Sequence, residues 1–273
     1  MGNGIEDTNP TPPWIELPRD VTENILSRLR PVEILENAQY VCTTWRSVCN
    51  EPSIWRVIDM KISLIEDHDI FFIHNIACRR AVDLSQGELL NINIEFFGTN
   101  DLLHYISKRS SRLKRLRLKY CDYISGEALR ASFKNFPELE ELQLFFMSRI
   151  TAEHIEGISI SCPNLKSFTF IKRSSRFAPL EIDDSYALTI AKIMPNLQHL
   201  CLIGNKLSNE GLEAILNGCP KLESLDLRKC YNVDLQGDFG KICSERIKYL
   251  KCHSNSTNDN EWDDMIIEED MII

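Results

Sequence analysis

Residues 139–144 read LEELQL, a phrase in which three leucines alternate with charged or polar residues. Leu142 and Leu144 are two positions apart, so in an extended strand both side chains point to the same side of the backbone. Leu139 lies on the turn that leads into this strand. A strand this short cannot bury its apolar side by itself, which predicts that similar units stack against it.

The same pattern of apolar residues, at relative positions one, four and six, occurs seven times in the chain. Successive copies begin 24, 26, 26, 32, 25 and 25 residues apart. Their length and spacing resemble those of leucine-rich repeats, whose units have about 20–29 residues. The copies begin at Leu89, Leu113, Leu139, Leu165, Leu197, Leu222 and Ile247.

The segments between the copies are predicted to be helices. Residues 209–216 place Leu212, Ile215 and Leu216 on one helical face, and residues 185–194 show similar spacing. A proline, which stops a helix, precedes four of the copies. These are Pro137, Pro163, Pro195 and Pro220. We therefore expect an α/β fold, a curved solenoid with short parallel strands on its concave face and helices on its convex face.

Residues 17–55 read LPRDVTENILSRLRPVEILENAQYVCTTWRSVCNEPSIW and do not follow the repeat pattern. Val21, Ile25 and Leu26 recur at helical spacing, and Pro31 separates a first helix from a second. The segment is therefore predicted to form three short helices. From the residues alone, such a bundle is either the N-terminal cap that a repeat array needs or a docking module.

The order Leu-Pro, Ile-Leu, Leu, Pro, Val-Cys, Trp-Arg, Pro and Trp in this segment resembles the F-box. Together with the repeats, the chain from Trp14 to Cys252 is similar to plant F-box/LRR-repeat proteins of the Skp-interacting-partner type. The resemblance implies a substrate-recognition subunit of an SCF-type (Skp–cullin–F-box) ubiquitin ligase. Such a subunit binds a Skp-family adaptor, and through it a cullin-RING ligase, and presents a protein substrate for ubiquitination and proteasomal degradation. The alternative is a protein-interaction scaffold with a helical cap and no ligase role.

The resemblance assigns the adaptor contacts to apolar residues of the F-box segment. Some of these residues must instead fill the core of the bundle, and the sequence does not separate the two groups. The assigned residues are Leu17, Pro18, Ile25, Leu26, Leu29, Leu35, Val41, Cys42 and Trp45.

The chain is predicted to divide into five parts. A tail at residues 1–13 precedes the F-box at residues 14–60, and a linker helix within residues 61–88 leads to the repeats at residues 89–256. Residues 257–273 contain seven acidic residues and are predicted to be a disordered tail. The long fourth step places an inserted loop at residues 172–184. The apolar face of the linker helix is expected to contain Ile70, Ile73, Ala77, Ala81 and Leu84.

Two features of the predicted concave face are candidates for substrate binding. Phe145, Ile171 and Ile203 each follow the third apolar residue of adjacent copies, so they are expected to adjoin. This apolar patch either binds a partner or is covered by the next loop. A neighbouring strand is basic, and we expect it to bind an acidic segment of the substrate. Its three cations are Arg115, Arg117 and Lys119.

The composition and the absence of certain motifs argue against several other classes of function. A formal net charge of −9 over 273 residues argues against nucleic-acid binding, where basic charge supplies most of the affinity. The sequence shows no bilayer-length apolar run and no signal peptide, so a nuclear or cytoplasmic location without membrane association is expected. Ten cysteines without a Cys-x-x-Cys pair predict buried free thiols. No phosphate-binding loop or catalytic motif occurs, so we expect no cofactor, no metal and no enzymatic activity.

Overall fold

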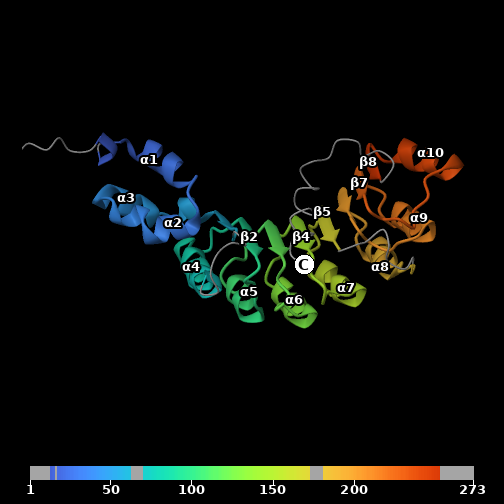
Figure 1. The fold of residues 1–273 in the computed structure, drawn as a ribbon, viewed down its shortest axis with the longest axis horizontal. Helices are drawn as coiled ribbons and strands as arrows, with labels where there is room; N and C mark the ends of the chain where they lie inside the picture. The colour runs from blue at the N-terminus through green and yellow to red at the C-terminus, as the bar shows by residue number, and fades with distance from the viewer. Residues whose placement is uncertain (1–12, 16, 63–69, 173–180, 253–273) are drawn as a thin grey trace, which may run out of the picture.

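The computed structural model describes residues 13–15, 17–62, 70–172 and 181–252 of the chain. The molecule is elongated, with a small helical module at its N-terminal end and a curved α/β solenoid beside it (Figure 1). Residues 1–12 of the predicted N-terminal tail, most of the predicted loop at residues 172–184, residues 253–256 of the predicted repeats and the acidic tail at residues 257–273 lie outside the described residues.

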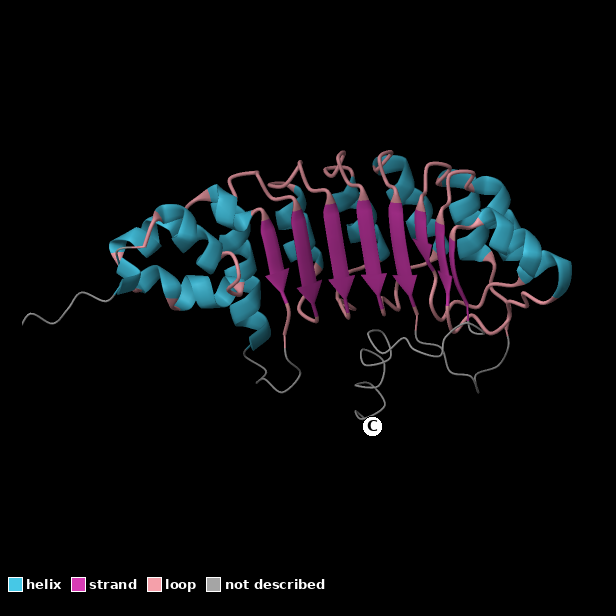
Figure 2. Cartoon of the chain, turned by 90° about the horizontal axis from the view of Figure 1, so that it is seen from above, coloured by secondary structure: helices cyan, strands magenta, loops and turns pink. Residues whose placement is uncertain are grey.

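The described strands form one parallel sheet of eight strands in sequence order (Figure 2). Leu142 lies opposite Leu116 on one side and Phe168 on the other, so equivalent residues of successive repeats form continuous columns. This confirms the predicted fold class. The strands are β1 (Val57–Met60), β2 (Asn91–Glu95), β3 (Arg115–Lys119), β4 (Glu141–Phe145), β5 (Ser167–Ile171), β6 (His199–Cys201), β7 (Ser224–Leu227) and β8 (Tyr249–Cys252).

A row of helices covers the convex side of the sheet, and each helix follows the strand of its unit (Figure 1). From α4 to α9, neighbouring helices pack against one another along the row. Leu116, Leu142 and Leu225 point into the layer between sheet and helices and are fully buried. The helices are α4 (Ile70–Leu84), α5 (Asn100–Ser107), α6 (Gly126–Phe133), α7 (Ala152–Ser161), α8 (Ser185–Ile193), α9 (Asn209–Gly218) and α10 (Gly237–Arg246).

The solenoid begins one unit earlier than the sequence prediction. Trp55, Ile58 and Met60 repeat the apolar pattern and are buried, and β1 pairs with β2 in the common register. Helix α4 packs against β1, against α5 and against α2 of the helical module. The predicted linker helix is therefore also the convex helix of this first unit.

The buried face of α4 is also shifted from the prediction. His74, Ala77, Cys78 and Ala81 are buried, whereas Ile73 is exposed. The buried residues follow one helical stripe at spacings of three and four, and position 73 lies outside it. The first turn of α4 consists entirely of Ile and Phe, so its apolar residues could not fix the phase of the helix.

The helical module is built from three α-helices, as predicted, and three 3-10 turns. Leu26, Val48 and Trp55 fill its core, and the Trp55 indole Nε1–H donates a hydrogen bond of 2.8 Å to the Cys49 carbonyl. Most buried apolar residues of the module and the solenoid belong to one hydrophobic core that runs through both. The elements are η1 (Pro13–Ile15), α1 (Arg19–Leu26), α2 (Pro31–Glu36), η2 (Ala38–Tyr40), α3 (Thr43–Cys49) and η3 (Pro52–Trp55).

Candidate functional site

The helical module exposes large apolar side chains at the end of the molecule. Five of them are 37% to 68% exposed, and they lie on η1, on α1 and at the end of η2. The Trp45 indole Nε1–H donates to the Trp14 carbonyl at 3.3 Å, which holds η1 against α3. Exposed apolar groups of this size are typical of a docking surface. The five residues are Trp14, Ile15, Val21, Tyr40 and Val41.

The structure separates the predicted adaptor contacts into inward-facing and outward-facing residues. Leu26 and Leu35 are 0% and 7% exposed, because each lies on the helix face that packs into the common core. They are therefore corrected from contact residues to core residues in this structure. Pro18 and Val41 are exposed. The remaining residues are half-buried, namely Leu17, Ile25, Leu29, Cys42 and Trp45.

Four of the exposed residues were not among the predicted contacts, namely Trp14, Ile15, Val21 and Tyr40. Val21 offered a signal in the sequence, because it is an apolar residue four positions before the predicted contact Ile25 and therefore on the same helix face. Cys42 has a structural role as well, because its Sγ accepts a hydrogen bond from the Trp45 backbone N–H at 3.4 Å at the start of α3.

The predicted apolar patch on the concave side is present but buried. Phe145, Ile171 and Ile203 lie together with Phe146 in a second hydrophobic cluster, as their spacing predicted. Their exposed fractions are 0%, 1% and 2%, so of the two alternatives the patch is covered in this structure and not exposed to a partner. One covering group is the Arg117 guanidinium, which lies 4.5 Å from the centre of the Phe145 ring.

The basic strand β3 has carboxylates on both sides. Arg115 Nε lies 3.1 Å from Glu141 Oε2 on β4, and Arg117 Nη2 lies 3.9 Å from Glu95 Oε1 on β2. Lys119 Nζ is 4.0 Å from the other oxygen of Glu95. The charges of the basic strand are therefore compensated in this structure, and an acidic partner must compete with Glu95 and Glu141.

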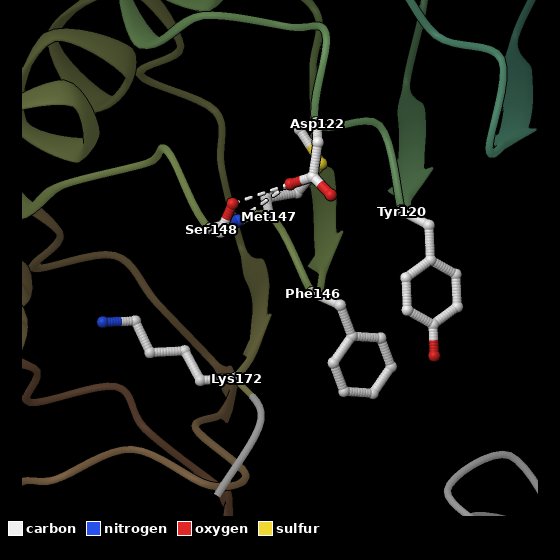
Figure 3. A pocket seen from close by; sticks show the side chains of 6 residues that line it. All are labelled: Tyr120, Asp122, Phe146, Met147, Ser148 and Lys172. Carbon is white, nitrogen blue, oxygen red and sulfur yellow. Dashed lines mark hydrogen bonds between the residues drawn. The ribbon is translucent and has the colours of Figure 1, made fainter. Parts of the chain in front are cut away.

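A cavity of about 390 Å³ lies at the strand ends of the two central units (Figure 3). The Asp122 carboxylate lies on one side of it and accepts a hydrogen bond of 2.8 Å from the Ser148 hydroxyl. Phe146 and Tyr120 border the cavity with stacked rings, and Lys172 borders it from the next unit. This site was not predicted, because its residues follow the strands and lie outside the repeated pattern.

The described residues contain no cluster of three or more His, Cys, Asp or Glu placed to hold a metal. In the same part of the chain, no helix has the length and apolar character needed to cross a bilayer. All ten cysteines are free, and burial raises the pKa of the Cys121 and Cys230 thiols to about 12. These thiols are therefore protonated packing groups at neutral pH.

A helical module with an exposed apolar end is thus fused to a leucine-rich solenoid. The F-box-like family model matches residues 14–61, and the Leucine Rich repeat model matches residues 194–216. Neither describes a family of enzymes.

Similar proteins occur in Arabidopsis thaliana. F-box protein SKIP19 is 45% identical over 254 residues, which cover 93% of this chain and 80% of the relative. Putative F-box/LRR-repeat protein 22 is 47% identical over 251 residues, which cover 91% of this chain and 80% of the relative. The chain belongs to the family of plant F-box/LRR-repeat proteins.

A solved structure shares the fold. A chain of the Rad7 and Elc1 complex in yeast superposes with a TM-score of 0.50 at 15% sequence identity, covering 88% of this chain and 69% of that chain. The arrangement of a helical module followed by a solenoid is therefore not particular to the plant sequences.

Proposed function

We propose that this chain is the substrate-recognition subunit of an SCF-type E3 ubiquitin ligase. The F-box docks on a Skp-family adaptor, and the repeats hold a protein substrate for ubiquitination and proteasomal degradation. The chain itself has no catalytic role in this proposal, and it acts in the nucleus or the cytoplasm. The observation that carries the proposal is the group of exposed apolar side chains on an F-box module at one end of a solenoid. The fold neighbour is a chain of the Rad7 and Elc1 complex, so a protein of this fold was solved together with a protein partner.

The connection between the two parts suits this role. Because β1 continues the sheet and α4 packs on both α2 and α5, the F-box has no separate hinge among the described residues. Seven steps between strands, each about 4.8 Å, give a sheet roughly 34 Å wide. A rigid arm of this size would hold a substrate at a fixed distance from the charged enzyme. Such tethering raises the effective concentration of the target lysines, which is how a non-catalytic subunit accelerates transfer.

The adaptor contact is tested with the double variant Leu17→Ala/Pro18→Ala. The Pro18 carbonyl accepts hydrogen bonds from the backbone N–H of Thr22 at 3.0 Å and from its hydroxyl at 3.2 Å, and an alanine keeps that carbonyl. The variant is therefore expected to fold and to lose co-purification with the adaptor.

The matched control is Leu188→Ala, which removes an exposed apolar side chain from α8. It is expected to co-purify with the adaptor like the wild type. Undiminished adaptor binding by the folded double variant would favour the alternative of a scaffold without a ligase role.

A further inference from the structure

Three aromatic rings form a stack at the edge of the sheet where the strands end. Phe96, Tyr120 and Phe146 each follow the last residue of a strand and have positive φ angles of 72°, 54° and 55°. The backbone N–H of each donates a hydrogen bond of 2.9–3.1 Å to the carbonyl oxygen of the last residue of the next strand. The ring centroids are 4.8 Å apart at both contacts, with interplanar angles of 16° and 10°. The stack thus follows the spacing of the strands.

The fourth position of this series is Lys172. Its backbone N–H donates to Ile203 at 3.0 Å, which is the same bond that the three aromatic residues make. The side chain turns away from the stack (Figure 3). Its ammonium lies 3.9 Å from the centre of the Tyr186 ring. The cavity of about 390 Å³ therefore lies beside Phe146, where the next ring of the stack would be.

The cavity is bordered by one cation, Lys172, and one carboxylate, Asp122. Among the described residues, no carboxylate lies within 4.0 Å of the Lys172 ammonium. Burial lowers the pKa of this group, and the more distant Asp183 carboxylate partly opposes that shift. On the other side, the Asp122 carboxylate keeps acceptor capacity beyond its bonds to Ser148. The cavity thus suits a flat ring with an N–H donor, accompanied by a carboxylate that pairs with Lys172.

The chain contains a segment with this chemistry. Residues 259–264 read DNEWDD, so Trp262 stands between acidic residues on both sides. The segment lies outside the described residues, and Trp262 follows Cys252, the last residue of β8, by ten positions. Because all strands are parallel, β8 ends at the same edge of the sheet as β4 and β5 (Figure 2).

The distance is within reach of the chain. β8 is three to four strands away from the cavity. At about 4.8 Å per step, this is a distance of roughly 14–19 Å. Ten residues span at most about 33–36 Å when extended. We propose that Trp262 docks in the cavity against Phe146, with its indole N–H directed to Asp122 and its acidic neighbours paired with Lys172.

Tethering makes this contact effective even when its intrinsic affinity is low. A segment joined to its site by a short linker has an effective concentration on the order of millimolar. Any external ligand of the same chemistry must therefore displace the segment. The identification of this ligand as a segment of a ubiquitination substrate rests on the function proposed above. The docking of Trp262 itself does not depend on that function.

The test is a titration of a fluorescein-labelled peptide of residues 257–266 into full-length protein, followed by fluorescence anisotropy. The wild-type protein is expected to bind this peptide at least ten-fold more weakly than the Trp262→Ala variant, because its cavity is occupied by its own segment. Adding Lys172→Glu to Trp262→Ala is expected to remove the binding. The control Lys221→Glu makes the same charge change on an exposed lysine that precedes β7, and it is expected to leave the binding unchanged.

Two results would overturn the inference. One is equal peptide affinity of the wild type and the Trp262→Ala variant. The other is undiminished binding by the folded Trp262→Ala/Lys172→Glu variant, with folding checked by circular dichroism. The assay contains no adaptor, so its outcome is independent of whether the chain is a ligase subunit.

Discussion

Replacing Ile58 by alanine tests whether β1 is a full unit of the solenoid that joins the F-box to the repeats. Ile58 is 0% exposed and lies opposite Ile92 of β2. Truncating a fully buried isoleucine costs about 2–5 kcal/mol, because it removes buried methyl groups and leaves a cavity. A loss of about 3 kcal/mol lowers the folding equilibrium constant by roughly 150-fold. With a denaturant slope of about 3 kcal/mol/M, the urea midpoint falls by about 1 M.

The assay is equilibrium urea unfolding, followed by the fluorescence of the tryptophans and by circular dichroism. Val57→Ala is a matched control, because Val57 is the preceding residue of the same strand, points to the other face and is 58% exposed. It is expected to change the stability by less than about 0.5 kcal/mol. Equal effects of the two substitutions would refute the assignment of β1 as a buried unit.

Three further predictions concern buried thiols, helix packing and the basic strand. Cys121 and Cys230 are expected to resist iodoacetamide at pH 8 until the protein unfolds. Burial raises the pKa of both thiols from the ordinary 9.0 to about 12, so their protonated form contributes fully to stability below pH 9, and this contribution is lost as the pH rises towards 12. Rapid labelling of the native protein would contradict this. Gly218→Ala places a Cβ 2.1 Å from a backbone oxygen of α8 and should lower the free energy of unfolding by about 1–3 kcal/mol. An unchanged midpoint in a denaturant titration would disprove the close packing of the two helices. Arg115→Glu/Arg117→Glu should reduce the amount of protein captured with the chain after proteasome inhibition, and unchanged capture would remove the acidic-partner hypothesis.

Much of the fold could be predicted from the sequence, because one physical requirement recurs in every unit. Leu142 and Leu144 must share a buried side, and a spacing of about 25 residues leaves room for one strand and one helix. The first unit was missed because Trp55 also completes the F-box pattern. Its strand is followed by a longer interval, with 34 residues from Trp55 to Leu89, which exceeds the usual repeat length.

The docking regions were predicted less completely, because exposure depends on neighbouring units. The spacing placed Phe145 and Ile171 side by side correctly, but it could not show that the Arg117 side chain folds over the Phe145 ring. The carboxylates beside β3 come from the two adjacent strands, and only the register of the sheet reveals those pairs. In the F-box, the apolar pattern identified the helices, whereas the packing of three helices decides that Leu26 is buried and Val41 exposed.

The most direct test of the central claim is a calorimetric titration of a Skp-family adaptor into the full-length chain. We predict a saturable one-to-one complex for the wild type and loss of binding for Tyr40→Glu/Val41→Glu, which places charges on two exposed apolar positions of the F-box. Leu188→Glu, on the exposed surface of α8, should bind the adaptor like the wild type. No binding heat for the wild type, or undiminished affinity of the folded Tyr40→Glu/Val41→Glu variant, would contradict the account.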